Sequence, residues 1–469
     1  MRVDVGARAA RRAARALAAL AAPLLLYLAP QPVFAHQLNE RYQAPLPLIV
    51  YVAGAAIAVA MSFVFVMLRN GSAPRESAAT DERPPRRVPA WLRVGLQAVG
   101  LIAWAWVVVQ TFTGGVGDGD VSSLFLWVYG WVGVALVSAL LGPVWAWLSP
   151  FATIHQLLSA AAARLGLSGG APADYPDRLG RWPAVVGFIV VAWLELVGRV
   201  EGGRTLGLFL IAYTFVTVAA MGYFGRETWR ARGETFSVWF DVLGRLAPFG
   251  LDGEPEDGRV RRRSFASGLM SAPWTLAELV LVSLATGAII FDGLSQTQAY
   301  FDLLVVQSPL GDAVVRDTIT GTAFIGGVTL VVLAVARVLT VRAVAAGLLP
   351  VAVGYLIAHY LSYMLIDGQR IIAALNDPLL RGDNLLPGNL GFWQPTAFIP
   401  TSIVWTIQLA AVVGGHIVGA WAGHAVLTQD EGRAPAMRQL PLALLMVTLT
   451  TITLWSLGQA VLVTTPAGG

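Results

Sequence analysis

The sequence predicts an all-α fold, a polytopic integral membrane helix bundle with about ten spanning helices after an N-terminal signal or anchor. Two observations predict it. The chain of 469 residues is 56% hydrophobic and only 13% charged, whereas a soluble domain carries about 25% charged residues. Its arginines also lie mainly in loops between long apolar stretches. The net charge of +4 therefore reflects topology, and we expect the lipid bilayer as a partner and no nucleic acid.

The first 35 residues have the order of a secretory signal peptide. A basic leader precedes an apolar run over 16–28, and prolines and small residues then lead to Ala35. This order predicts cleavage after Ala35, with an uncleaved anchor helix over 1–35 as the alternative. Cleavage would leave His36 at the new N-terminus, where its α-amine and imidazole form a chelate suited to copper. We therefore treat His36 as a candidate copper ligand.

Ten apolar stretches follow the leader, each close to the roughly 20 residues that a spanning helix needs. They cover 45–68, 94–113, 122–142, 182–197, 205–224, 273–291, 319–341, 346–366, 399–424 and 440–463. Together they form a bundle over 36–463, and 464–469 is a short tail. No stretch predicts a separate soluble domain.

The arginines predict the orientation of these spans. Loops at 69–93, 143–181 and 225–272 hold most of the arginines, whereas loops at 292–318 and 367–400 hold few. Because Arg-rich loops stay in the cytoplasm, the first set is cytoplasmic and the second lies outside, as do both mature termini. We expect a multi-pass protein of the plasma (inner) membrane.

Two of these loops carry further expectations. In loop 225–272 an apolar stretch around 236–246 predicts a surface helix. An acidic run and the basic run from Arg259 to Arg263 come next, where we expect disorder and contact with anionic lipid. The outer loop 367–400 follows the most polar helix and is long enough to form a lid over a site.

One span carries a polar stripe. Tyr355, His359, Tyr363 and Asp367 recur every four residues, so they share one face of a helix. In lipid such a stripe points at the protein interior or at a water-filled cavity. His359 lies about 20 Å from the cytoplasmic start of its span, which places it in the outer half of the membrane.

Four ionisable residues from three predicted helices converge on this outer half: Glu195, Asp292, His359 and Asp367. A charged side chain at mid-membrane costs about 2.5–3.5 kcal/mol on insertion scales, so such residues usually have a partner or a purpose. The cluster could bind a divalent metal of unknown identity through His359 and Asp292, or it could relay protons. The structural alternative is a simple pairing of His359 with Glu195.

The span at 399–424 carries glycines at four-residue spacing, Gly415, Gly419 and Gly423. Small residues in this pattern allow the backbone of a neighbouring helix to approach closely. His416 and His424 lie on the same span, in its inner half. The pattern predicts close helix packing and says little about function.

Several short segments form a series along the chain. They are Tyr175-Pro-Asp-Arg-Leu-Gly-Arg-Trp-Pro183, Ala192-Trp-Leu-Glu195-Leu, Phe291-Asp292-Gly293-Leu-Ser295, Ala358-His359-Tyr360 with Gly368-Gln369, Asn376-Asp377-Pro378, and Gly414-Gly415-His416. In this order they resemble a family of bacterial polytopic membrane proteins, the fenitrothion hydrolases. The resemblance covers most of the chain beyond the leader.

The resemblance implies hydrolysis of an organophosphate triester, which is a small apolar substrate. Water activated by a metal or by a carboxylate would attack phosphorus, and His359 and Asp292 would ligate the metal. The other roles would fall to nearby polar residues: Glu195 or Asp367 for orienting or deprotonating the water, and Gln369 or Arg370 for stabilising the oxyanion.

Other classes of function stay open. The chain has no Cys, which excludes disulfides, thiolate metal sites and a Cys nucleophile, and it has no P-loop, HExxH or GxSxG motif. A transporter or permease for a metal ion or small solute fits the same polar cluster. A non-catalytic anchor subunit of a larger complex is the third class.

Overall fold

The computed structural model describes residues 84–457 except 116, 168–172, 201, 307–308 and 432–435, together with residues 54, 57 and 61. Within this part of the chain, nine helical segments are long and apolar enough to cross a membrane. They correspond to the nine spans predicted from residue 94 onward, so the all-α polytopic fold is confirmed. The predicted signal, His36, the first span and the tail at 464–469 lie outside the described residues.

The spanning segments are α3 (Ala90–Thr113), the continuous α4 (Val121–Ser123), η1 (Leu124–Val134) and α5 (Ala135–Leu140), α8 (Trp182–Leu196), α9 (Gly203–Phe224), α13 (Leu276–Ser295), α15 (Ala313–Val338), α16 (Val341–Asp367), α18 (Thr401–Glu431) and α19 (Ala436–Leu457). Some begin before their apolar cores, because a polar N-cap sets the first turn. Asp312 accepts a hydrogen bond from the Val315 N–H at α15, and Thr340 does the same for Ala343 at α16.

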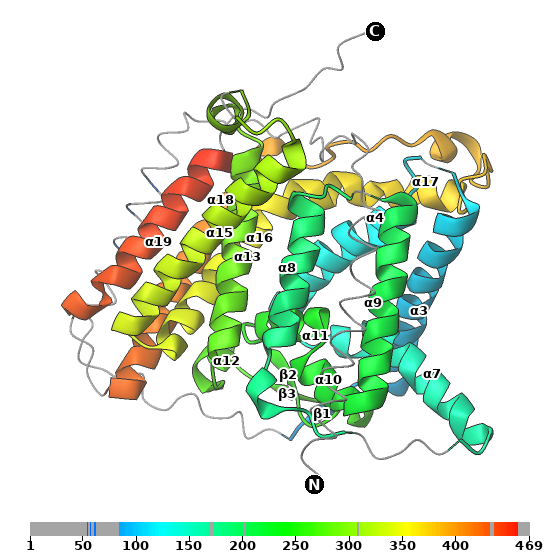
Figure 1. The fold of residues 1–469 in the computed structure, drawn as a ribbon, viewed down its shortest axis with the longest axis horizontal. Coiled ribbons are helices and arrows are strands. Elements are labelled where there is room, and N and C mark those ends of the chain that lie inside the picture. The colour runs from blue at the N-terminus through cyan, green and yellow to red at the C-terminus, as the bar shows by residue number, and fades with distance from the viewer. Residues whose placement is uncertain are drawn as a thin grey trace.

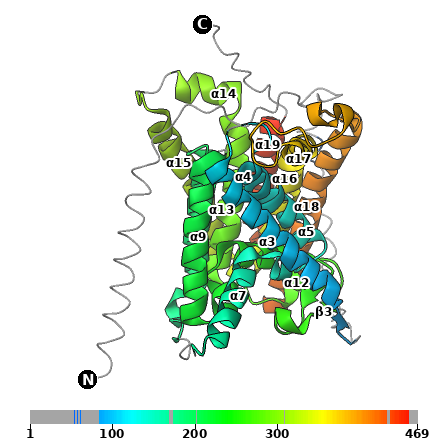
Figure 2. The same ribbon diagram turned by 90° about the vertical axis from the view of Figure 1, so that its right-hand side faces the viewer.

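The connecting elements gather at two ends of the bundle (Figures 1 and 2). The loops predicted to be cytoplasmic contain β1 (Arg86–Arg87), α6 (Trp145–Leu148), α7 (Pro150–Arg164), η2 (Asp177–Leu179), α10 (Arg226–Arg232), α11 (Thr235–Gly244), β2 (Phe249–Leu251), η3 (Pro255–Asp257), β3 (Arg259–Arg262) and α12 (Ser267–Ser271). The loops predicted to be outside contain α14 (Gln298–Tyr300), η4 (Phe301–Val305), η5 (Gly368–Arg370), α17 (Ile371–Asn376) and η6 (Gly388–Phe392). We call these the inner end and the outer end.

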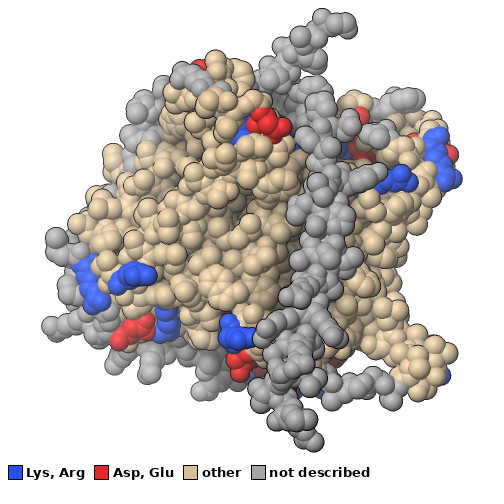
Figure 3. All heavy atoms as spheres, in the orientation of Figure 1, with Lys and Arg blue, Asp and Glu red and all other residues tan. Residues whose placement is uncertain are grey.

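The surface between the two ends is apolar. Figure 3 shows a broad uncharged face with arginines along its lower edge, which is the inner end. Exposed apolar side chains on the spanning helices contribute to this surface, among them Phe215 on α9 and Leu330 on α15. A surface of this kind is stable in contact with lipid, so the bilayer surrounds the bundle.

Helix α16 is the centre of the bundle. It contacts η1, α13, α15, α18 and α19, and nearly all of its residues up to Tyr363 are buried. The predicted polar stripe does point inward, since Tyr355, His359 and Tyr363 are all buried. Burial by five neighbours forces each polar group on this helix to find a partner on another helix.

Helices α16 and α18 pack backbone against backbone. A methyl group added at Gly415 would lie 2.5 Å from the carbonyl oxygen of Pro350, and one added at Gly354 would lie 2.5 Å from the carbonyl oxygen of Ala411. No side chain fits at either position. The close approach predicted from the glycine spacing is therefore confirmed.

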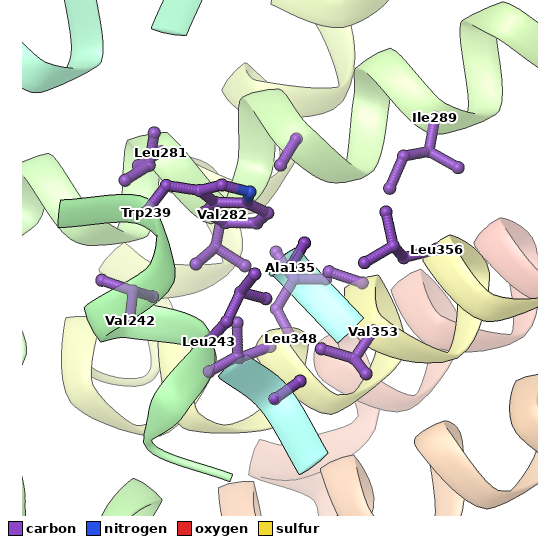
Figure 4. Close-up of a cluster of buried hydrophobic side chains, with 14 of the residues drawn as sticks. Ala135, Trp239, Val242, Leu243, Leu281, Val282, Ile289, Leu348, Val353 and Leu356 are labelled. Atoms are coloured by element: carbon purple, nitrogen blue, oxygen red, sulfur yellow. The ribbon is translucent and has the colours of Figure 1, made fainter. Parts of the chain in front are cut away.

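The loop 225–272, predicted to be cytoplasmic, differs from the sequence expectation. The predicted surface helix is α11, and it is a core element: Figure 4 shows Trp239, Val242 and Leu243 in one apolar cluster with Leu281 of α13 and Leu348 of α16. Instead of disorder, the following run forms β2 and β3, and these strands join β1 in a three-stranded antiparallel sheet in the order β1-β3-β2.

A buried cap explains why α11 can lie in the core. Glu234 is 1% exposed, and its carboxylate accepts hydrogen bonds from the backbone N–H groups of Phe236 and Ser237. These backbone N–H groups in the first turn of α11 therefore have hydrogen-bond partners without water. In a stretch of this length, apolar residues on both faces do not distinguish a surface helix from a buried one.

Candidate functional site

Three spanning helices bring acidic and basic side chains together near the outer end. Helix α13 does not end at Phe291 as predicted but continues to Ser295, so Asp292 lies on a helical turn. Glu195 lies at the end of α8, and His359 and Tyr360 lie on the outer half of α16. We call His359, Asp292, Tyr360 and Glu195 the outer acid cluster.

The shortest contact in the cluster joins the histidine to the aspartate. His359 Nε2 lies 2.6 Å from Asp292 Oδ2, and the side chains are 7% and 19% exposed. The other oxygen of Asp292 accepts a hydrogen bond from Gln296 at 3.0 Å. Charge-assisted bonds of this length are strong, and two bonds fix the carboxylate. The expected alternative, a pairing of His359 with Glu195, is not the contact that forms.

Tyr360 connects the two carboxylates. Its hydroxyl lies 3.3 Å from Glu195 Oε1 and 3.3 Å from Asp292 Oδ2. A hydroxyl has one proton, so it donates to one carboxylate at a time. The Tyr360 ring also packs edge-to-face on the His359 ring, with centroids 4.6 Å apart. Tyr360 therefore holds the geometry of the whole cluster.

The second nitrogen of His359 faces small residues. A methyl group added at Gly293 would lie 3.6 Å from His359 Nδ1 and 3.1 Å from Ser456 Oγ. No described residue forms a hydrogen bond with Nδ1. With an ionised Asp292 accepting from Nε2–H, Nδ1 carries the lone pair of the neutral imidazole. This nitrogen can accept a proton from water or substrate.

The structure places the other expected residues elsewhere. Asp367 lies two helical turns beyond His359, about 12 Å along the axis, and it pairs with Arg370 at 2.9 Å. Arg370 also pairs with Asp118 at 2.8 Å. Gln369 donates to the backbone of the outer loop and accepts from Trp393. Asp367, Gln369 and Arg370 therefore fasten the outer end, and none of these contacts involves His359.

A second polar cluster lies deeper in the membrane, between α16, α18 and α19. His416 Nε2 lies 2.6 Å from the hydroxyl of Thr450 and 3.2 Å from that of Tyr355. Its Nδ1 lies 2.7 Å from the carbonyl oxygen of Val412. His416, Tyr355 and Thr450 are each 0% exposed. We call them the mid-membrane cluster.

Polar groups continue inward from this cluster. His424 lies two turns farther along α18, and its Nδ1 is 3.0 Å from Gln439 Oε1 on α19. The three histidines thus follow one another from the inner end to the outer end along the α16–α18 contact. Such a series is unusual in lipid, because each buried polar group must be paired.

The expected metal has few ligands here. Among the described residues, no group of three or more His, Asp or Glu side chains is placed to hold a metal ion. His359 and Asp292 supply two ligands, whereas protein zinc sites use three or four. These residues do not complete a metal site by themselves, so the chemistry of the site is argued from its side chains alone. The metal stays a prediction that elemental analysis of the purified protein tests.

The sequence interpretation did not include Tyr360 among the site residues. Successive residues of a helix point about 100° apart, so Tyr360 lies beside the four-residue stripe and faces α8 and α13. The sequence showed only that Tyr360 follows His359 and that two other spans carry carboxylates. The pattern could not show that one hydroxyl would reach both carboxylates.

No protein-family model matches this chain, and no curated protein is significantly similar to it in sequence. The function must therefore be argued from the geometry of the outer acid cluster.

Proposed function

We propose that this chain is a plasma-membrane hydrolase that cleaves small apolar organophosphate triesters at the outer acid cluster. One observation carries the proposal: His359 is oriented by Asp292 at 2.6 Å through one nitrogen, and its other nitrogen forms no hydrogen bond with a described residue. A histidine held by a carboxylate in this way is a general base. The segments that resemble fenitrothion hydrolases support the class of substrate.

The reaction uses the dyad to activate water. His359 Nδ1 takes a proton from a water molecule while the water oxygen attacks phosphorus. The bond from phosphorus to the leaving oxygen breaks, and the leaving group departs with the electron pair. The proton passes from His359 to that group or to solvent, so triester and water give a diester and an alcohol or phenol. Asp292 balances the charge on the imidazolium, and such a base contributes about 10²–10⁴-fold in rate.

Tyr360 and Glu195 complete the site. The Tyr360 hydroxyl keeps Asp292 in register with His359 and separates the two carboxylates. Glu195 is half-buried and offers a second carboxylate for orienting the water. Both lie in the outer half of a bundle that lipid surrounds, so a triester dissolved in the outer leaflet reaches the site without crossing the membrane.

The experiment measures nitrophenolate release from a diethyl nitrophenyl phosphotriester by the purified full-length protein in liposomes. We expect turnover by the wild type and its loss in His359→Gln, which keeps a hydrogen-bonding side chain beside Asp292. Asp367→Asn is the matched control, because this aspartate on the same helix pairs with Arg370, and its turnover stays near that of the wild type. Absence of wild-type turnover, or full turnover in His359→Gln, would refute the proposal.

A proton-coupled permease is the second candidate. The observation that favours it is the series His424, His416 and His359 along the α16–α18 contact. In proteoliposomes with a pH-sensitive dye inside, a permease gives substrate-dependent proton flux that His416→Gln abolishes. A hydrolase gives no such flux, and its turnover survives this substitution.

A further inference from the structure

A cavity at the inner end is rich in arginine. It has a volume of about 330 Å³ and lies among α5, α6, α10, α11 and β2. Four arginines line it, namely Arg181, Arg230, Arg245 and Arg263, and the single carboxylate in the lining is Asp241. We call it the inner arginine pocket. It lies at the opposite end of the bundle from the outer acid cluster.

Carboxylates pair with most of the arginines of the pocket. Glu278, which is 2% exposed, pairs with Arg181 at 2.7 Å and with Arg245 at 2.5 Å. Asp241 also pairs with Arg181, and Glu227 pairs with Arg230. These three carboxylates pair with three of the four arginines, and a fourth carboxylate, Glu234, is bonded to the lining residues Trp145 and Ser237.

Arg263 is the arginine of the pocket that has no salt bridge with a described residue, although the charge of Asp241 acts on it. It donates to the backbone carbonyl oxygens of Gly244 and Ala247 after α11. Burial lowers the pKa of the Arg245 guanidinium and also that of Arg263, which shows that both charges have lost part of their hydration.

Two buried donors in the lining have no partner. Arg245 Nη1 and Ser138 Oγ are both inaccessible to solvent and form no hydrogen bond with the described residues. The Arg245 side chain is 10% exposed, and Ser138 is 0% exposed. Buried polar atoms are almost always paired, so this charged donor and this hydroxyl beside the cavity keep hydrogen-bonding capacity that acceptor oxygens of a ligand could use.

The arginines are held in place without that ligand. The Arg245 guanidinium lies over the Trp274 ring, 4.1 Å from its centroid, while its other nitrogen bonds Glu278. Arg263 is fixed by its two backbone carbonyls. Rigid guanidinium groups match the oxygens of a phosphate in a bidentate manner, and little side-chain entropy is left to lose on binding.

We propose that the inner arginine pocket binds a phosphate group, carried either by the headgroup of an anionic phospholipid in the cytoplasmic leaflet or by a soluble phosphate compound. Trp145 and Phe240 supply apolar wall for the part of the ligand next to the phosphate. Basic pockets between membrane helices on the cytoplasmic side are suited to acidic headgroups. The inference does not depend on the function proposed for the outer end.

The test uses the full-length protein, delipidated in neutral detergent. The thermal unfolding midpoint is measured against inorganic phosphate, with chloride at equal ionic strength as reference. A second arm titrates phosphatidylglycerol against phosphatidylcholine. The variants are Ser138→Ala, which removes only an unpaired hydroxyl, and Arg245→Gln. Arg259→Gln is the matched control, because Arg259 lies on β3 outside the pocket lining.

We expect phosphate or phosphatidylglycerol to raise the unfolding midpoint of the wild type. Ser138→Ala and Arg245→Gln each raise the half-saturating concentration by about tenfold, the value of one charge-assisted hydrogen bond, and the control responds like the wild type. A response to the lipid alone identifies a headgroup, and a response to free phosphate identifies a soluble compound. No response of the wild type to either probe, or equal responses of all four proteins, would overturn the proposal. If Arg245→Gln fails to fold, the half-saturating concentration measured for Ser138→Ala alone tests the proposal.

Discussion

Two buried histidines on neighbouring helices have opposite surroundings. His359 on α16 meets the carboxylate of Asp292, with Glu195 one tyrosine hydroxyl away. His416 on α18 meets the hydroxyls of Tyr355 and Thr450 and a backbone carbonyl. Both histidines are buried, at 8% and 0% exposure. They therefore differ in partner far more than in exposure.

The difference decides what each imidazole can do. A carboxylate supplies the counter-charge that a buried imidazolium needs, so His359 can take a proton during a reaction. Hydroxyls and a carbonyl pair with a neutral ring but leave an added charge uncompensated in lipid. We infer that His359 takes part in the proposed reaction. His416 has a structural role and joins α18 to α16 and α19.

The largest effect should come from Asp292→Asn. The amide keeps the shape of the side chain but removes the counter-charge and the acceptor that orients His359. We expect turnover of a nitrophenyl phosphotriester to fall by about 10²–10⁴-fold, with an unchanged unfolding midpoint. A stopped assay of nitrophenolate release measures it. Turnover within a few-fold of the wild type would mean that the aspartate does not serve the histidine.

Tyr360→Phe should have a smaller effect. It removes the hydroxyl that lies between Asp292 and Glu195 and leaves the ring against His359. Because two carboxylates then face one another with no donor between them, we expect turnover to fall about tenfold, the value of one hydrogen bond to a charged group. The same assay measures the loss. An unchanged rate would show that the hydroxyl does not position Asp292.

His416→Gln should change stability and leave turnover near the wild-type value. Loss of the imidazole leaves the buried hydroxyls of Tyr355 and Thr450 poorly paired, which costs about 1–3 kcal/mol. A lowered unfolding midpoint in detergent, measured by intrinsic Trp fluorescence, checks this. A rise in stability would contradict the structural role given to this histidine.

Glu195→Gln should have the smallest effect on turnover of the three substitutions in the outer acid cluster. The amide oxygen still accepts from Tyr360, and Asp292 remains as the counter-charge of His359. We expect turnover to fall by about threefold at most, since a neutral acceptor is weaker than a charged one. A loss as large as that of Asp292→Asn would make Glu195 the base instead.

Much of the fold could be predicted from the sequence. Apolar length alone located the spans, and the four-residue stripe on α16 correctly placed Tyr355, His359 and Tyr363 in the interior. The glycines of α18 predicted its close packing. Periodicity and spacing are properties of one helix, so they can be read from the chain without knowing its neighbours.

The pairing within the site could not be predicted, because it depends on how separate helices are rotated against each other. Both Asp292 and Glu195 were candidates for His359, and only the packing of α13 and α8 on α16 selects Asp292. Asp367 shared the stripe but lies two turns away with Arg370. The core position of α11 could not be predicted either, since it depends on Glu234 and on contacts with α13 and α16.

The most direct test compares His359→Gln with His416→Gln, the same substitution at the two histidines, in one assay of triester turnover in liposomes. The account predicts that the first loses turnover by about 10²-fold or more and that the second keeps it. Equal losses in both, or a loss confined to His416→Gln, would contradict the assignment of chemistry to the outer acid cluster.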